Sequence, residues 1–512
     1  MRHHNGSAIS IPLVLCLMLG LGAGSAQADG PVTPVPVGSQ KRLTWDDALM
    51  DKADGIRFEM HRPHRTGERN LVGDKPWESW QIGGMSSLLH ENGKFRLWYG
   101  VSHGIRHGEE YAVAYAESDD GIHWRKPELG LVEYAGSKQN NLVLGYSSVI
   151  GQVFVDPHAK SGEKYKMLAA IYPTKDSDPK RYLTLLSSPD GLTWSPPTRN
   201  VVREGDFALD TQSQAFWDRD RKSYVLFTRM GPWRQVGRSE SIDSFAFPAP
   251  KLVMQPDEPV KADYYQAGVT KYEEAANAYF GLVPIFFHPG DAQGNPADGN
   301  PPLTINYVKN PITVVAPDTL DIHLFTSNDS IRWRRQGEHA PFLGLGPDGE
   351  FDSRSLYPGV GYAVVGSEIW LYYSAYNCTH IESLDGAEPF SKYLGAITRA
   401  TLRLDGFVSA TAGHAGAEII THPLTFTGDK LELNVDCSAG GHLNVELQSV
   451  DGKPLPGFSL ADSDRVYHNN IRKTVTWKGR SSLAQIAGQP VRLRLTLRDC
   501  RLYAFQFVKS SP

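Results

Sequence analysis

Short apolar runs alternate with polar turns along most of the chain, and one such pattern occurs four times. In each copy a carboxylate precedes an apolar run, a polar turn follows, and a second, strongly aromatic run closes the unit. The leading carboxylates are Glu78, Asp210, Asp263 and Asp352. Because both runs are short and separated by turn residues, each copy predicts a β-hairpin. A hairpin that repeats along a chain indicates a stacked or radial array of sheets.

A second motif recurs in phase with the hairpins and predicts their outer strands. The segments 118–124, 188–194 and 327–333 share the form Ser-x-Asp-x-x-x-Trp, with Gly after the Asp in the first two. Asp-Gly supplies the positive backbone torsion angle of a tight turn, and the Trp is expected to pack the turn on its own sheet. A further hairpin at 151–169 lacks a leading carboxylate. Five units over about residues 70–410 predict an all-β, five-bladed β-propeller.

The remaining segments complete the predicted domain organisation. After about residue 421 the strands alternate apolar and polar residues, which is typical of half-buried strands in a β-sandwich. No aromatic platform is visible there, so we expect this domain to cover the propeller rather than to bind sugar. The predicted boundaries are a signal peptide at 1–28, an N-terminal extension at 29–69, the propeller at 70–415 and a C-terminal β-sandwich at 425–512.

The N-terminus predicts export. A basic start at Arg2 precedes an apolar run at 9–21, and Ala26-Gln27-Ala28 fits the small-x-small cleavage pattern. The mature protein is therefore expected to be secreted or periplasmic and to hold no membrane segment, with an uncleaved anchor as the alternative. In an oxidising compartment Cys437 and Cys500 could pair, or they could remain thiols with Cys378. The net charge of −5 gives no basic footprint for a nucleic acid.

A five-bladed propeller with central carboxylates and a following β-sandwich resembles the superfamily of invertases, levansucrases and arabinanases. The C-terminal part is similar to the sandwich appended in glycoside hydrolase family 32, and the chain resembles exported bacterial proteins that are like that family. The invertase motifs themselves are not matched. Residues 77–80 read Trp-Glu-Ser-Trp, 155–157 read Val-Asp-Pro, and 209–211 read Leu-Asp-Thr at the three motif positions. No catalytic residue is therefore carried over by motif, and fold alone does not assign a function.

The candidate site follows from propeller geometry. The starts of the innermost strands and the loops between second and third strands face the same side of such a fold. Glycosidic cleavage needs one protonated and one ionised carboxyl group. The predicted catalytic residues are Glu78, Asp210 and Asp352, with their roles left open. The predicted substrate-binding residues are Trp77, Trp80, His103, His107, Trp233, Asp263, Tyr264, Arg354 and His380. Tyr265, Arg229 and Arg234 belong to the same set of loops.

Three functions fit these residues, and all three have a carbohydrate as the partner. The first is an exported glycoside hydrolase that acts on a poly- or oligosaccharide. The second is a polysaccharide lyase that uses His and Tyr as acid and base and Arg to neutralise a uronate. The third is a sugar-binding protein without catalysis, in which the carboxylates only cap turns. No motif indicates a metal or another cofactor, and none supports a calcium ion on the propeller axis.

Overall fold

The computed structural model describes residues 33–510 with several gaps. The gaps are 104–110, 146–147, 172–181, 198–200, 203–210, 231–233, 243–244, 258–261, 288–302, 308–309, 315–318 and 381–394. Across the described ranges the chain is all-β, as predicted, and its only helical turns are the 3₁₀ segments Asp47–Leu49 and Pro76–Glu78. None of the helices in these ranges is long and apolar enough to cross a membrane.

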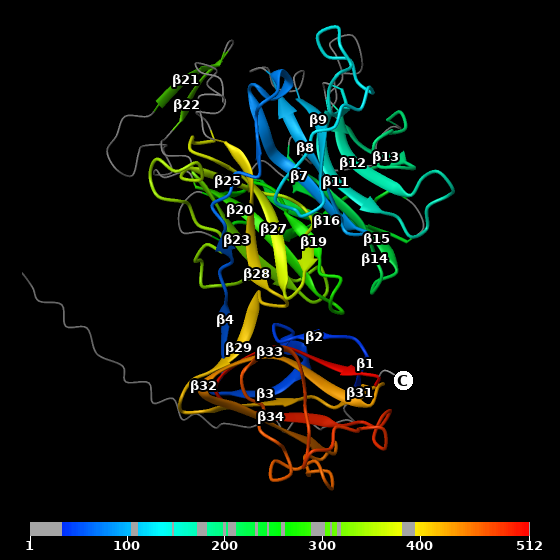
Figure 1. The fold of residues 1–512 in the computed structure, drawn as a ribbon, viewed down its shortest axis with the longest axis vertical. Coiled ribbons are helices and arrows are strands. Elements are labelled where there is room, and N and C mark those ends of the chain that lie inside the picture. Colours follow the sequence, from blue (N-terminus) through cyan, green and yellow to red (C-terminus); the bar gives the residue numbers. More distant parts are fainter. Residues whose placement is uncertain are drawn as a thin grey trace, which may run out of the picture.

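The central part of the chain consists of successive antiparallel meanders (Figure 1). The first three meanders are separate sheets. The first unit contains β7 (Gln81–Glu91), β8 (Lys94–Ser102), β9 (Tyr111–Ser118) and β10 (Leu142–Leu144). The second unit contains β11 (Ser148–Val155), β12 (Tyr165–Ile171) and β13 (Tyr182–Ser188), and the third contains β14 (Gln214–Asp218), β15 (Ser223–Met230), β16 (Gln235–Ser241) and β17 (Lys251–Met254).

A larger sheet holds two more meanders, which a parallel contact between Leu320 and Ser355 joins. The fourth unit contains β18 (Ala262–Tyr264), β19 (Val269–Lys271), β20 (Tyr279–Phe287), β23 (Leu320–Ser327) and β24 (Arg334–Arg335). The fifth contains β25 (Ser355–Pro358), β26 (Ala363–Val365), β27 (Glu368–Tyr376) and β28 (Ala396–Arg403). The hairpin of β21 (Leu303–Tyr307) and β22 (Asn310–Val314) stands apart.

Polar side chains connect the first strands of neighbouring units, which are called the inner strands below. Gln212 donates from Nε2 to the carbonyl oxygens of Ser86 (2.9 Å) and Gly151 (2.7 Å). The Ser87 hydroxyl accepts from the backbone N–H of Val153 at 2.9 Å, and the Ser87 backbone forms a parallel bridge with that of Val360. Strand β7 therefore contacts both the unit that follows it and the last unit of the series.

Two short strands from the beginning of the chain complete the edge of the fifth unit. β5 (His64–Arg65) and β6 (Leu71–Val72) both pair with β28. In Figure 1 the blue N-terminal segment runs along the yellow strands of that unit. The sheet edge is thus covered by chain that is distant in sequence, which removes unpaired backbone groups from that edge.

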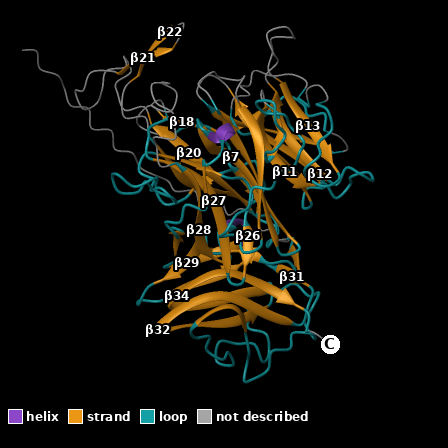
Figure 2. Cartoon of the chain, turned by 45° about the horizontal axis from the view of Figure 1, so that its top comes forward, coloured by secondary structure: helices purple, strands orange, loops and turns teal. Residues whose placement is uncertain are grey.

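The C-terminal residues form a second body, which lies on the side away from β21 and β22 in Figures 1 and 2. Its strands are β2 (Arg42–Leu43), β3 (Met50–Asp54), β4 (Arg57–Met60), β29 (Val408–Ala412), β30 (Ala417–Thr421), β32 (Lys430–Gln448), β33 (Asn469–Thr474) and β34 (Arg492–Val508), and β1 (Val35–Gly38) pairs β31 (Leu424–Phe426) beside them. They enclose a core that includes Val445, Trp477 and Leu493. Strands from the predicted extension at 29–69 and from before residue 425 therefore share this sheet.

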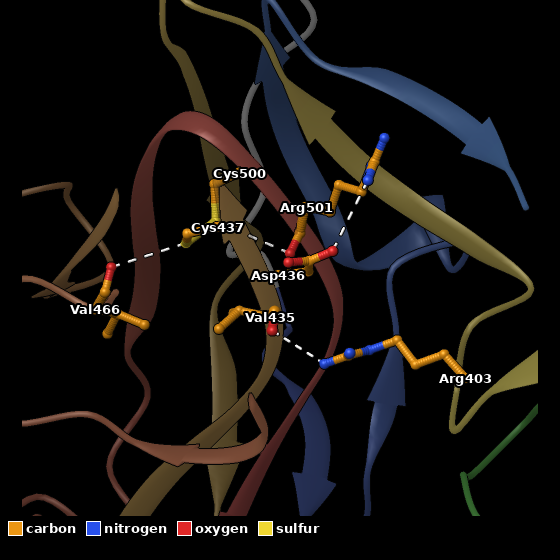
Figure 3. Close-up of a disulfide and its surroundings, with 7 residues drawn as sticks. All are labelled: Arg403, Val435, Asp436, Cys437, Val466, Cys500 and Arg501. Carbon is orange, nitrogen blue, oxygen red and sulfur yellow. Dashed lines mark hydrogen bonds and ion pairs between the residues drawn. A yellow bond between two sulfur atoms is a disulfide. The ribbon is translucent and has the colours of Figure 1, made fainter. Parts of the chain in front are cut away.

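A disulfide joins the two long strands of the second body (Figure 3). Cys437 of β32 lies opposite Cys500 of β34 and is bonded to it. Beside the bridge, Arg403 donates to the carbonyl oxygen of Val435 at 3.0 Å. Cys378 is buried and forms no disulfide with the described cysteines. Of the two states that the sequence left open for Cys437 and Cys500, the structure has the disulfide, which is the state expected in an oxidising compartment.

The repeated Ser-x-Asp motif forms the same turn in each copy. The Oδ1 atom of Asp120 accepts from the backbone N–H groups of Ile122 and His123, both at 2.8 Å. Asp190 and Asp329 cap their turns in the same way. Trp124 then donates from its indole N–H to the carbonyl oxygen of Gly121, a residue with φ of +71°. These carboxylates and tryptophans are turn and packing residues, as the sequence predicted.

Candidate functional site

An aromatic cluster lies at the leading end of the inner strands, which is the end at which β7, β18 and β25 begin. Trp80, Tyr265, Tyr357 and Tyr376 are buried together with Phe286 and Cys378. The ring of His380, which follows β27, lies edge-on to Tyr265 with centroids 4.8 Å apart. Because strands of the first, fourth and fifth units supply these rings, the cluster forms only when the units come together.

Tyr357 and His380 form a hydrogen-bonded pair within this cluster. The Tyr357 hydroxyl lies 2.7 Å from Nδ1 of His380. Burial, together with the nearby Tyr265, raises the pKa of Tyr357 well above its ordinary value, so the phenol stays protonated at neutral pH. A protonated phenol joined to an imidazole can pass a proton to or from a ligand in the cluster.

Arg234 and Asp263 form the charged part of the same region. The Arg234 guanidinium lies over the Tyr265 ring at 4.7 Å and over the Phe286 ring at 5.3 Å. Its Nη1 atom is 3.6 Å from Asp263, is buried, and makes no hydrogen bond within the described part of the chain. Arg234 also has a φ of +48°, a strained conformation for a residue other than glycine. Strain and an unfilled donor on one residue are features of a ligand-binding site.

Glu78 is completely buried, and its carboxylate is saturated with donors. Oε1 accepts from the Tyr99 hydroxyl at 2.8 Å. Oε2 accepts from Lys126 at 2.6 Å and from the backbone N–H groups of Asp74 and Lys75 at 3.1 and 3.2 Å. Burial raises the pKa of Glu78, while Lys126 and the other donors oppose that rise. With its lone pairs occupied, this carboxylate holds the 74–78 turn against β8.

Asp352 likewise has a structural partner. Its Oδ2 atom accepts from Arg65 of β5 at 2.9 Å, and Arg65 also donates to the carbonyl oxygen of Gly344 at 3.1 Å. The contact therefore fastens the N-terminal strand to the loop before β25. Arg354 pairs with the exposed Asp348 at 2.6 Å. Asp352 and Arg354 were both predicted site residues, but their described contacts hold the loop before β25 in place.

The other predicted residues divide between packing, the cluster and the undescribed segments. Trp77 donates to Asn141 at 2.9 Å, His103 packs edge-on against Tyr134, and Tyr264 donates to Asp257 at 2.9 Å. Asp210, His107 and Trp233 lie outside the described residues. Of the predicted site residues, the structure brings Trp80, Asp263 and His380 together at the cluster.

Sequence reasoning missed Tyr357 and Tyr376, which looked like ordinary core residues of apolar strands. The Tyr376 hydroxyl donates to the carbonyl oxygen of Ile82, so it connects the fifth unit to the first. The usable signal was their position, since Tyr357 follows the start of an inner strand and Tyr376 ends the next strand of the same hairpin. No group of three His, Cys, Asp or Glu side chains could hold a metal ion in the described segments.

Comparison with known proteins gives distant matches. No family model matches the chain. An uncharacterised protein of Mycobacterium tuberculosis strain H37Rv is 25% identical over 140 residues, which are 27% of this chain and 39% of that protein. Its counterpart from strain CDC 1551 is 24% identical over 140 residues, again 27% of this chain and 39% of that protein. The chain thus spans about two fifths of the curated relatives that it matches.

Solved structures provide the second comparison. A Coprinopsis cinerea family 62 α-L-arabinofuranosidase matches with a TM-score of 0.42 and 12% identity, over 67% of this chain and 97% of that one. A Bacillus subtilis family 43 arabinoxylan arabinofuranohydrolase matches with a TM-score of 0.36 and 13% identity, over 88% and 99%. With TM-scores below 0.5, these likenesses carry no argument about activity. Several of these neighbours are glycoside hydrolases of families 43 and 62, and another is an N-acetylgalactosamine deacetylase.

Proposed function

We propose that this protein is an exported carbohydrate-active enzyme, a glycoside hydrolase, whose substrate binds at the leading end of the inner strands. The observation that carries the proposal is the position of the Arg234–Asp263 pair against the buried rings of the cluster. Aromatic rings provide apolar surfaces for sugar rings, and a few placed polar groups fix the orientation of a ligand.

The proposal includes the architecture that supports this site. We propose that the five meanders close into a five-bladed propeller and that the second body is a β-sandwich. Two observations support closure of the ring. Ser87 of the first unit contacts Val153 of the second and Val360 of the last, and β5 and β6 complete the edge of the last unit. Closure brings the starts of all inner strands to one mouth.

The chemistry proposed for this site uses two carboxyl groups. A glycosidase places one on each side of the bond that it cleaves, one as acid and one as base or nucleophile. Asp263 is the carboxylate that the described structure places beside the aromatic cluster. Asp210, which precedes the inner strand of the third unit, is the proposed second group. Arg234 would orient sugar hydroxyls through its fork of donors.

A second candidate function is a lyase, which the Tyr357–His380 pair favours. In β-elimination a base removes the proton next to the uronate carboxylate, and an acid protonates the leaving oxygen. Tyr357 and His380 could divide these tasks, with Arg234 neutralising the carboxylate. This reaction leaves a new carbon–carbon double bond in the product, whereas hydrolysis does not.

The test is a screen of the mature protein against furanosides, neutral glycans and uronate polysaccharides. Reducing ends and ultraviolet absorbance are measured together. We expect reducing ends without new absorbance, with kcat/KM falling about 10²- to 10⁴-fold in Asp263→Asn and unchanged in Asp348→Asn, an exposed carboxylate. New absorbance that is lost in Tyr357→Phe would support the lyase instead. Activity that survives Asp263→Asn would overturn the proposed site, and silence across the panel would favour a binding protein.

A further inference from the structure

A cavity of about 390 Å³ lies at the trailing end of the inner strands, which is the end opposite the aromatic cluster. All five units line it. The lining residues are 88–90, 152–155, 216–217, 270–271, 273–274 and 361–364. Trp80 and Tyr357 of the cluster and the adjacent Asp263 precede these positions on their own inner segments, so the cavity is separate from the proposed active site. Its volume is within the range of small-molecule sites.

Gln152 gives this cavity a buried polar atom without a hydrogen-bond partner in the described structure. The residue is only 8% exposed and lines the cavity, and its Oε1 atom makes no hydrogen bond within the described part of the chain. It lies where the pairing of β11 with β12 shifts register, between Ile150 and Val153. A buried amide oxygen without a partner costs about 1–3 kcal/mol. A ligand that donates a hydrogen bond into the cavity would remove that cost.

The charges of the lining exclude an anion. The Lys271 ammonium already forms ion pairs with Asp220 at 2.6 Å and with Asp218 at 3.3 Å. Burial lowers the pKa of His90, the other basic residue in the lining, so this ring is neutral at neutral pH. At the exposed rim, Glu273 already pairs with Arg219 at 3.2 Å, and Glu274 adds a further acceptor. The open groups of the lining therefore accept hydrogen bonds and call for a ligand rich in donors.

The apolar part of the lining narrows the ligand further. Phe154 and Phe216 are buried, and Trp217 is half-buried beside them. A ring with hydroxyl groups around its edge and an apolar face suits both halves of this surface. A simple hydrocarbon would leave Gln152 without a partner, and an anion would meet Glu273 and Glu274.

We propose that this cavity is a second, non-catalytic carbohydrate site that holds one neutral sugar unit. Gln152 and Glu274 accept hydrogen bonds from its hydroxyl groups, and Trp217 contacts its apolar face. The proposal goes beyond the function assigned to the leading end and does not depend on it. A protein with both sites could hold a polysaccharide at one end of the inner strands while another part of it reacts at the opposite end.

The test is isothermal titration calorimetry on the full mature protein. The probes are glucose, arabinose, xylose and N-acetylglucosamine, with glucosamine as a cationic probe. We expect a neutral sugar to bind, and Gln152→Leu to weaken that binding at least tenfold because the cavity keeps its volume but loses its amide. The control Gln139→Leu alters an exposed glutamine and should leave binding unchanged. Glu274→Gln, at the exposed rim, should weaken binding severalfold and serves as the second variant if Gln152→Leu does not fold.

Three results would overturn the proposal. They are the absence of binding by every neutral sugar, unchanged affinity in a folded Gln152→Leu variant, and binding of glucosamine alone, which would indicate a cation site. Where Gln152→Leu does not fold, unchanged affinity in Glu274→Gln has the same meaning. Turnover is measured separately on the same variants. Lost binding with retained turnover supports the second site, whereas lost turnover in Asp263→Asn with retained binding concerns only the leading end.

Discussion

The two ends of the inner strands hold similar residue types in different states. At the trailing end, Lys271 contacts Asp218 and Asp220, and Asp218 also accepts from Tyr279. At the leading end, Arg234 stays 3.6 Å from its carboxylate and has a buried nitrogen without a hydrogen bond in the described structure. A charge whose hydrogen bonds are complete contributes to the fold, whereas one left incomplete is available to a ligand. The state of their hydrogen bonds therefore separates Arg234 from Lys271 better than their shared charge does.

The largest expected effect comes from removing Lys271 from the ion-pair network at the trailing end. Lys271→Met leaves Asp218 and Asp220 without their ammonium partner, and removing one partner of a buried pair costs roughly 3–5 kcal/mol. We expect the free energy of unfolding, measured with urea, to fall by that amount, while Lys251→Met at an exposed position changes little. A loss below about 1 kcal/mol would show that Lys271 does not form buried ion pairs with Asp218 and Asp220.

Glu78 tests whether saturation or position decides the role of a carboxylate. Glu78 precedes an inner strand and so belongs to the leading end by sequence, yet both oxygens of its carboxylate already accept hydrogen bonds. We expect Glu78→Gln to lower the free energy of unfolding by about 3 kcal/mol, because Lys126 loses its buried partner. The kcat of the folded fraction should not change, and Glu128→Gln, at an exposed glutamate that follows Lys126 closely in the sequence, is the control.

A double-mutant cycle sharpens the same prediction. Glu78→Gln and Lys126→Met together should cost less than the sum of the two single changes, because both single changes break the same buried ion pair, while Lys126 keeps its contact with Asp74 at 2.6 Å when Glu78 is replaced. Additive costs would contradict the pairing. Loss of catalysis in Glu78→Gln with unchanged stability would return Glu78 to the active site.

Arg234 should give the opposite result to Glu78. Arg234→Lys keeps the charge but loses the planar fork and its stacking on Tyr265. We expect kcat/KM to fall about 100-fold, equivalent to about 2.7 kcal/mol, with little change in Tm. The exposed Arg332→Lys is the matched control, because Arg332 contacts only its own turn among the described residues. A large loss of Tm in Arg234→Lys with normal kcat/KM would make this residue structural.

The smallest expected effect is a pH dependence at the trailing end. Burial alone would raise the pKa of Glu240, but hydrogen bonds from Ser223, Arg238 and Arg221 outweigh it and lower the pKa from 4.5 to about 2. A carboxyl group with a lowered pKa in the folded state stabilises the fold above its unfolded pKa and loses that contribution as pH falls through the folded value. The stabilisation should therefore be complete above pH 4.5 and disappear toward pH 2.

Urea unfolding of wild type and Glu240→Gln across this pH window measures the effect. We expect a difference of about 1 kcal/mol or less at neutral pH, because Glu240 is partly exposed. The difference should shrink toward pH 2. A difference that grows as the pH falls would contradict the sign of the predicted effect.

Local patterns predicted the strands and turns well. Each Ser-x-Asp motif forms its turn from atoms within a few residues, and the hairpins around residues 82–99 and 214–227 need only neighbouring strands. The sequence also placed Trp80, Asp263 and His380 in one region. It did not separate them from Glu78 and Asp352, because the partners of those two carboxylates, Lys126 and Arg65, come from other segments.

By itself, the sequence determined the all-β character, the repeated hairpins and the turn carboxylates, since these depend on short-range alternation and on backbone torsion preferences. Only the tertiary structure decided that the Glu78 carboxylate is saturated with donors and that Arg234 keeps a buried nitrogen without a hydrogen bond in the described part of the chain. It also decided that strands 64–65 and 71–72 complete the last meander and that 42–60 joins the C-terminal sheet. The contact of Lys41 with Asp405 shows the reason, because burial and charge pairing depend on residues that the chain brings together across 364 positions.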